Sequence, residues 1–247
     1  MQIQEIGIGG ENEDGGNRRR DAIEDPPHGR EQKSAGDHET RSGHQRPGQG
    51  AAPKRIVAGE CGHAWRAAYA RWNTLAGPFD FLDPKYLAPQ HICEVTYDLM
   101  RRGAIRFDKS ANDQFVVTFH DSCNPARATR IGPYPGGQFE IPRAIIREVA
   151  NHFVEMSPDT IRERTFCCGA GAGVLTDEML DVRIRGAYPR MQALQAVVES
   201  DGVNFLATIC AICKAQFSTI LPYYKYDMNM VGGVHQLVSN AIRLGQK

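Results

Sequence analysis

The chain has no excess of charge of either sign, because 29 lysines and arginines offset 29 aspartates and glutamates over 247 residues. A protein without net charge has no global attraction to a phosphate backbone or an anionic membrane, so we expect no nucleic-acid partner. No apolar run approaches the ~20 residues needed to span a bilayer, and no charged and apolar signal sequence follows Met1. We therefore expect a cytoplasmic protein with no direct membrane span.

The first 50 residues lack cysteine, leucine, valine and every aromatic residue, whereas glycine and charged residues are frequent. Such a segment cannot bury enough apolar surface to offset the entropy lost on ordering. We interpret residues 1–53 as disordered. The alternatives are a binding arm, or sequence that is not native to the protein, as an incorrect start site would produce.

From Lys54 onward, β-rich runs alternate with helical patterns, which is typical of an α/β fold with a parallel sheet and crossover helices. The expected strands are residues 54–59, 114–119 and 203–209. The expected helices are residues 63–72, 143–156 and 190–200, the last closed by a cap at Gly202. Each strand leads into a cysteine, Cys61, Cys123 or Cys210, at the sheet edge where such folds bind ligands.

A weak internal repeat relates residues 61–64 (CGHA) to residues 210–213 (CAIC), each after an expected strand. Helical patterns at 91–100 and 235–244 fall in corresponding places. These similarities predict two pseudo-repeated halves, with an incomplete first half at 54–112 and a complete second half at 113–247. Because Ala64 stands where the second half has Cys213, the first half is not expected to hold an equivalent metal site.

Five of the seven cysteines form a pattern typical of a metal centre. We expect cysteines of a reduced cytosolic protein to be ligands, catalytic groups or core residues more often than disulfides. Thiolates are soft ligands that suit iron–sulfur clusters and zinc, and an adjacent pair favours a cluster over one tetrahedral ion. A structural zinc or simple packing is the alternative. The five candidates, in three loops expected at strand ends, are Cys123, Cys167, Cys168, Cys210 and Cys213.

Three further features have open interpretations. The glycines of residues 167–173 (CCGAGAG) either aim backbone N–H groups at sulfur or only permit close packing. Cys61 lacks partners and Cys93 lies within a helical pattern, so both are interpreted as packing residues.

The sequence resembles the cysteine-rich CCG domain of heterodisulfide reductases over residues 54–247. The resemblance is carried by residues 59–64 (GECGHA), 120–123 (HDSC), 165–171 (TFCCGAG) and 207–213 (ATICAIC). Within that family the sequence looks most like the C-terminal part of the K subunit of dissimilatory sulfite-reduction membrane complexes. It departs from the family at Ser122, where proline is common, and in lacking the ferredoxin-like C-x2-C-x2-C-x3-C-P run. The chain therefore looks like a piece of a longer protein.

The resemblance implies an oxidoreductase that reduces or forms a disulfide, heterodisulfide or trisulfide in sulfur-related anaerobic electron transfer. It implies a 4Fe–4S cluster of non-cubane type on the five cysteines. The implied partners are a membrane b-type cytochrome subunit, a ferredoxin-like electron donor or acceptor, and a small protein that carries the disulfide or trisulfide. Attachment at the inner face of a membrane would be peripheral, through partner subunits.

Two residues near Cys123 are candidates for roles in that reaction. His120 is the candidate proton donor, because histidine ordinarily titrates near neutral pH, or it only hydrogen-bonds its own loop. Arg127 either attracts an anionic substrate or faces solvent.

Other functions fit the same residues. A zinc or cluster scaffold would hold an electron-transfer complex together without catalysis. Related proteins serve 2-hydroxy-acid and glycerol-phosphate oxidation, so an iron–sulfur subunit of such a system is a second alternative. A dithiol oxidoreductase that uses Cys210 and Cys213 alone is a third. The shortened chain could also be inactive by itself.

Overall fold

The structure is a computed structural model that describes residues 55–76, 89–129, 138–171 and 173–243. All of these residues belong to one compact unit, Gly50–Lys247. The predictions for residues 1–53 and for Lys54 lie outside the described residues. The proposed boundary between residues 54–112 and 113–247 stays a prediction.

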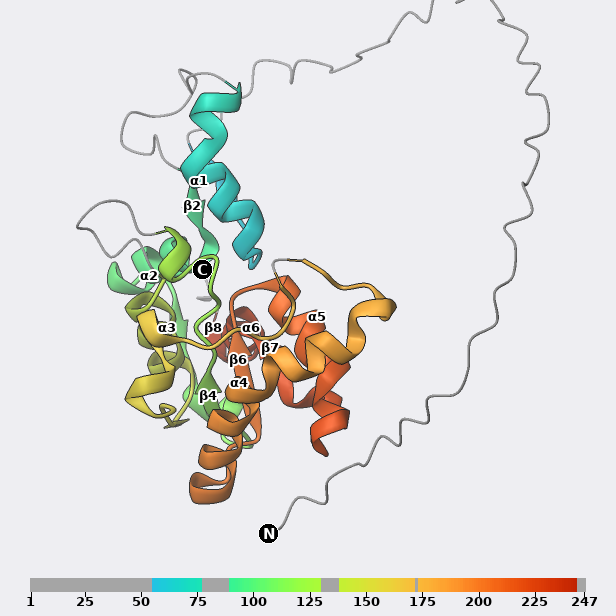
Figure 1. The fold of residues 1–247 in the computed structure, drawn as a ribbon. Helices are drawn as coiled ribbons and strands as arrows, with labels where there is room; N and C mark the ends of the chain where they lie inside the picture. Colours follow the sequence, from blue (N-terminus) through green and yellow to red (C-terminus); the bar gives the residue numbers. More distant parts are fainter. Residues whose placement is uncertain (1–54, 77–88, 130–137, 172, 244–247) are drawn as a thin grey trace, which may run out of the picture. The chain divides into compact units, whose positions relative to one another are not determined.

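A four-stranded parallel sheet forms the centre of the described part, which confirms the predicted α/β fold (Figure 1). Its strand order is β5-β4-β6-β7, and every neighbouring pair is parallel. The register places Val117 opposite Phe205 and Leu206 opposite Val231. The strands are β4 (Val116–Phe119), β5 (His152–Phe153), β6 (Phe205–Thr208) and β7 (Val231–Gly233).

Helices cover both faces of this sheet. Successive residues of a strand point to opposite faces, so β6 contributes side chains to two cores. Phe205 and Ala207 of β6 pack into a core with α2 (Ile92–Arg101), α3 (Glu140–Val149) and α6 (Val234–Ala241). Leu206 faces the other core, with α4 (Leu180–Asp201) and α5 (Ala211–Ile220). No helix in the described part is long and apolar enough to span a membrane.

The two segments that the predicted repeat relates share a strand-helix-strand-helix order, which β4, α3, β5 and α4 also have. It first appears as β1 (Val57–Ala58), α1 (Gly62–Ala76), β2 (Gln90–His91) and α2, and then as β6, α5, β7 and α6. In both copies the two strands pair in parallel. A separate antiparallel pair joins β3 (Arg106–Phe107) to β8 (Ile242–Arg243).

Several predicted helix boundaries are wrong: the helix expected at 63–72 runs to Ala76, the one expected at 235–244 ends at Ala241, and the two largest differences have clear causes. The helix expected at 143–156 is α3, which ends at Val149, and the chain then enters edge strand β5. Ala150 is already extended, and the Val154 N–H donates to the Val117 carbonyl over 2.8 Å, so pairing with the sheet ends the helix. The helix expected at 190–200 begins at residue 180 instead and contains Pro189, whereas its left-handed cap at Gly202 is confirmed.

Candidate metal centre

The five candidate cysteines lie at the carboxyl edge of the sheet, in three separate segments. Cys123 lies in the loop after β4, Cys210 is the N-cap residue of α5, and Cys213 lies in the first turn of that helix. Cys167 and Cys168 are in the connection between β5 and α4. This connection leaves the carboxyl end of β5 at Phe153 and is long, so the pair lies in a loop after a strand, as predicted, but far from that strand in sequence.

The sulfurs of the five cysteines shift one another's pKa values in an unbroken series, and those of Cys168 and Cys213 lie within 4.8 Å of each other. Cys168, Cys210 and Cys213 are buried, whereas Cys123 and Cys167 are only half-buried. All described cysteines are free thiols. The structure therefore brings the five together with the accessible side at Cys123 and Cys167, while their role as ligands stays a prediction. The contacting pairs are Cys123–Cys167, Cys167–Cys168, Cys168–Cys213 and Cys213–Cys210.

One negative charge of the series is expected at Cys167. The pKa of its thiol is strongly lowered, first because Cys123 donates a hydrogen bond to its sulfur and next because Cys168 does. The Gly169 nitrogen also donates to this sulfur over 3.3 Å. The two donors change in the opposite direction: the Cys123 pKa is raised, and the Cys168 pKa rises to about 12, both chiefly through the bond to Cys167.

A second negative charge is expected at Cys210. Its pKa falls to about 5, chiefly because Cys213 donates to its sulfur, and the Gly62 N–H is among the backbone donors. The pKa of Cys213 is raised by its bonds to Cys168 and Cys210 and by burial. The two sulfurs with lowered pKa values, Cys167 and Cys210, are thus separated by the neighbouring thiols Cys168 and Cys213, and a bound cation would displace the remaining protons.

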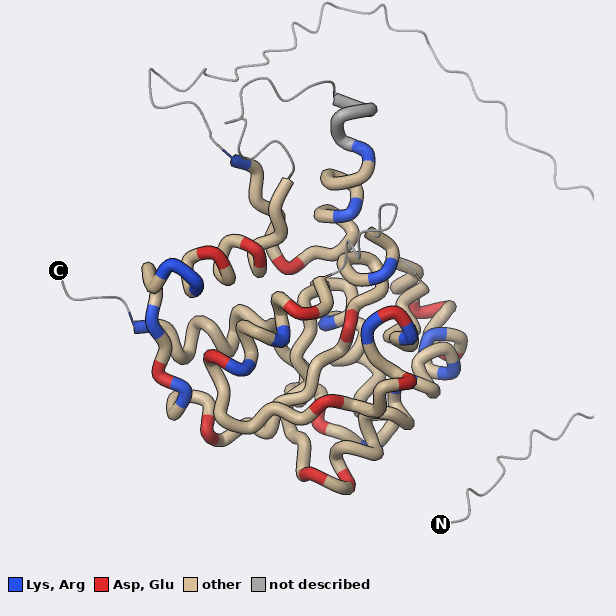
Figure 2. Tube along the Cα trace, turned by 90° about the vertical axis from the view of Figure 1, so that its left-hand side faces the viewer, with Lys and Arg blue, Asp and Glu red and all other residues tan. Residues whose placement is uncertain are grey.

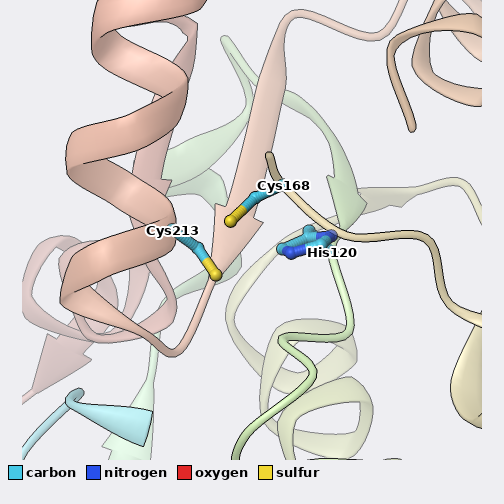
Figure 3. Close-up of side chains that lie close together, drawn as sticks. All are labelled: His120, Cys168 and Cys213. Carbon is cyan, nitrogen blue, oxygen red and sulfur yellow. The ribbon is translucent and has the colours of Figure 1, made fainter. Parts of the chain in front are cut away.

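His120 faces this cluster from the loop after β4 (Figure 3). One of its ring nitrogens and the sulfurs of Cys168 and Cys213 all lie within 4.8 Å of one another. The ring is 1% exposed and packs edge-on against Phe217, and neither ring nitrogen has a hydrogen-bond partner in the described part. Burial, with a smaller contribution from Arg190, lowers the pKa of His120 well below its usual value, so the neutral ring carries one N–H.

Gly169 serves both of the roles proposed for the glycine-rich segment. Its N–H binds the Cys167 sulfur, and its φ of +93° is in the left-handed region. A Cβ at this position would lie 2.3 Å from the Arg183 carbonyl oxygen of α4. Only glycine allows the cysteine pair to approach the helix this closely.

A buried ion pair behind the cysteines was not predicted. Arg143 of α3 donates to both carboxylate oxygens of Asp121 over 2.7 Å, and both side chains are fully buried. The Asp121 carboxylate also accepts from the Arg162 N–H, and its carbonyl accepts from the Thr165 hydroxyl, each over 2.8 Å. Asp121 therefore ties the Cys123 loop to the segment that leads into Cys167. The only sequence signal was a carboxylate two residues before a candidate ligand.

Cys61 and Cys93 are not part of the five-sulfur series. Cys93 is fully buried in α2, within 4.8 Å of ligand atoms of Glu60 and His235. Glu60 accepts hydrogen bonds from the backbone N–H of His235 and binds its Nδ1, each over 2.8 Å, which joins the β1 loop to α6. Residues of the predicted first half are therefore linked to the predicted second half, and the Gly62 N–H is a donor to the Cys210 sulfur.

The donor set fits an iron–sulfur cluster. Five contacting thiols exceed the four ligands of a tetrahedral zinc site, and soft sulfur donors are the ligands of iron–sulfur clusters. The two ring nitrogens of His120 without a hydrogen-bond partner in the described part also support a bound cluster. A buried polar atom without a partner in a native protein calls for a ligand or a special role.

Comparison with known proteins places these residues in a described family. The CCG cysteine-rich domain matches residues 117–218, a range that includes all five cysteines. A relative from Archaeoglobus fulgidus, named Hdr-like menaquinol oxidoreductase iron-sulfur subunit 2, is 38% identical over 76% of this chain and 37% of its own length. Its counterpart from Archaeoglobus profundus is 36% identical over 77% of this chain and 38% of its own length.

A more distant relative is a subunit of the dihydromethanophenazine:CoB–CoM heterodisulfide reductase from Methanosarcina mazei. It is 30% identical over 76% of this chain and 41% of its own length. The chain thus spans about two fifths of the length of the curated relatives that it matches. The family match and the iron–sulfur subunits among the relatives support an iron–sulfur cluster and an oxidoreductase role. The chain belongs to the CCG family of heterodisulfide-reductase-like proteins.

Proposed function

We propose that this chain is an iron–sulfur oxidoreductase subunit that reduces or forms a disulfide, heterodisulfide or trisulfide in sulfur-related anaerobic electron transfer. The proposed cofactor is a 4Fe–4S cluster of non-cubane type. The observation that carries the proposal is the unbroken series of sulfur contacts across three segments distant in sequence. The proposed ligands are Cys123, Cys167, Cys168, Cys210 and Cys213.

The adjacent pair favours a cluster over a single ion. Cys167 contacts Cys123 on one side, and Cys168 contacts Cys213 on the other, so the pair bridges the two ends of the series. Neighbouring side chains that serve opposite ends need a centre with spread metal positions, which one tetrahedral zinc does not provide.

The residues around the cysteines fit the needs of a sulfur substrate. When bound, the cluster supplies electrons one at a time for cleavage of the sulfur–sulfur bond. Reduction of a disulfide consumes two electrons and two protons and yields two thiols. The substrate approaches beside Cys123 and Cys167, the half-buried members of the set. Both protons reach the departing thiolates from solvent on that accessible side. His120, the candidate proton donor, donates a hydrogen bond from its one N–H at the buried side of the site, and it can transfer a proton only after it has itself been protonated, which its burial opposes.

The electrons come from other polypeptides in this proposal. The names of the relatives describe subunits of larger enzymes, which supports partner subunits for this chain as well. We propose a membrane b-type cytochrome subunit and a ferredoxin-like protein as the electron partners, and a small disulfide- or trisulfide-bearing protein as the substrate carrier. The proposed location is the cytoplasmic side of a membrane, reached through those partners.

Electron paramagnetic resonance of the anaerobically purified chain tests the proposal. We expect an iron–sulfur signal in a chemically oxidised sample that changes when a thiol is added, because the thiol reaches the cluster beside Cys123. A signal that no thiol changes supports a non-catalytic scaffold. A chain that binds zinc without iron contradicts the cluster itself.

A dithiol oxidoreductase is a second candidate, favoured by one observation. The Cys210 thiol has its pKa lowered to about 5 by a hydrogen bond from Cys213, as an attacking thiolate requires. Both sulfurs are buried, however, at 2% and 3% exposure, which hinders attack on a disulfide. A Cys167→Ser variant decides between the two: retention of full visible absorbance and disulfide-reducing activity would favour the dithiol mechanism.

A further inference from the structure

Arg190 of α4 is a fully buried arginine whose hydrogen-bond partners are all neutral. Its side chain is 0% exposed. Its Nη1 atom donates to the Met156 sulfur over 2.7 Å, and its Nη2 atom donates to the Thr165 hydroxyl over 2.9 Å and to the Thr160 carbonyl. Its Nε atom is buried and has no hydrogen-bond partner among the described residues. Arg190 therefore carries its charge into the protein interior without an ion pair to a described carboxylate.

The other fully buried arginine, Arg143, has the partners that Arg190 lacks. Charged residues of both signs are spread over the trace in Figure 2, so carboxylates are plentiful in the described part. Asp121 attracts Arg190, but both of its carboxylate oxygens are bound by Arg143 over 2.7 Å. The pKa of Arg143 is raised in spite of burial, by its bonds to Asp121 and Glu155. Burial lowers the pKa of Arg190 to about 10, so its guanidinium is still charged at neutral pH.

Arg190 lies behind the adjacent cysteine pair. The Thr165 hydroxyl accepts its hydrogen bond, and the Phe166 ring centroid lies 5.9 Å from its Cζ atom. These two residues directly precede the pair in sequence. Cys168 and Cys213 are among the groups whose negative charge would favour the charged form of Arg190. The guanidinium is therefore close enough to act on the candidate metal centre from within the protein.

A buried guanidinium without a counter-charge is unfavourable. Charges in a protein interior are normally paired, because the lost hydration is not otherwise replaced. Arginine does not relieve this cost by losing its proton at neutral pH. Metal binding removes the protons of cysteine ligands. Five thiolates carry more negative charge than a 4Fe–4S core carries positive charge, so the loaded centre would be an anion next to Arg190.

We propose that Arg190 is the counter-charge of the bound metal centre, which stabilises the loaded state and raises the reduction potential of the cluster. An added electron increases the negative charge of the centre, and a fixed positive charge nearby favours that change. The assignment rests on the proposed function, because the negative charge comes with the bound cluster. The role of Arg190 is electrostatic, and no proton or electron passes through it.

Two substitutions separate the charge of Arg190 from its hydrogen bonds. The reduction potentials of the iron-loaded variants are measured by anaerobic redox titration with electron paramagnetic resonance. Arg190→Gln should disfavour the reduced state about tenfold, or ~59 mV for one electron, whereas Arg190→Lys keeps the charge and should stay near the parent. An unchanged potential in Arg190→Gln overturns the assignment, as does an equal shift in both variants.

Arg185→Gln is the matched control, because it removes the same charge from an exposed position of the same helix. It should leave the potential unchanged. Arg190→Met, which fills most of the same volume without charge, provides the same comparison if Arg190→Gln does not fold.

The melting temperature with and without bound metal gives a second measurement. Arg190→Gln should lower the melting temperature of the loaded chain more than that of the metal-free chain, because only the loaded chain has the full negative charge. An equal loss in both states would mean that Arg190 serves only in packing, which overturns the assignment.

Zinc alone, titrated into the metal-free chain, keeps this test separate from the cluster. We expect about tenfold weaker zinc binding in Arg190→Gln and parent-like binding in Arg190→Lys, because zinc also gathers thiolates beside Arg190. A chain that binds zinc but no iron therefore contradicts the cluster while the role of Arg190 is still tested. A chain that binds neither metal overturns both proposals.

Discussion

Replacement of Asp121 by asparagine should destabilise the chain far more than the loss of one charge at the surface. Arg143 and Asp121 are both fully buried, and two bonds of 2.7 Å join them. Loss of one partner of a buried pair costs ~3–5 kcal/mol. Arg143 keeps Glu155 at 2.6 Å and the Phe139 carbonyl at 2.7 Å, so we expect the lower end, about 3 kcal/mol. For a chain of this size that is ~6–12 °C in melting temperature.

Thermal and urea denaturation of the full chain measure this change. The matched control is Asp159→Asn, which breaks an ion pair with Arg164 whose side chains are 76% and 71% exposed. We expect a cost below about 0.5 kcal/mol for the control. Asp121→Asn should also lower the iron content, because Asp121 holds Thr165 and the segment before Cys167. An Asp121→Asn variant no less stable than the control would refute the role assigned to this ion pair.

Two further variants test the surroundings of the cysteines. Gly169→Ala should lower the free energy of unfolding by at least about 3 kcal/mol and prevent iron binding, because the new Cβ meets the Arg183 carbonyl at a positive φ. The control Gly59→Ala, whose new Cβ has no atom within 4 Å, should melt within about 2 °C of the parent. His120→Phe should keep or raise the melting temperature, since it preserves the packing on Phe217 and removes two buried unpaired nitrogens. The same variant should make the reduction potential of the bound cluster more negative, because it removes an N–H donor near the sulfurs that would favour the reduced cluster. An unchanged potential would mean that His120 serves only in packing.

The sequence was most informative where chemistry and periodicity coincide. The strands before Cys123 and Cys210 and the left-handed cap at Gly202 were all predictable, because apolar runs, thiol spacing and glycine carry direct physical signals. The loops that hold Cys123 and Cys210 meet at one sheet edge because β4 pairs in parallel with β6, and the alternation of strands and helices implied this pairing.

Other features depend on tertiary contacts that no local pattern encodes. The helical spacing of apolar residues continued past Val149, but edge pairing of β5 with β4 ends α3 there. The first half of α4 was not predicted, because proline usually marks a helix boundary. Here Pro189 is accommodated within the helix. Arg143 resembled a solvent-facing residue of an amphipathic helix, and only its partner Asp121, distant in sequence, explains its burial.

The most direct test of the account is the iron and acid-labile sulfide content of the anaerobically purified chain and of its single cysteine-to-serine variants. We expect about four irons and a comparable amount of sulfide per chain for the parent, and the same for Cys61→Ser and Cys93→Ser. Serine at Cys123, Cys167, Cys168, Cys210 or Cys213 should in each case lower both contents and the visible absorbance. One zinc per chain without iron, or full iron in Cys167→Ser, would contradict a single centre held by all five sulfurs.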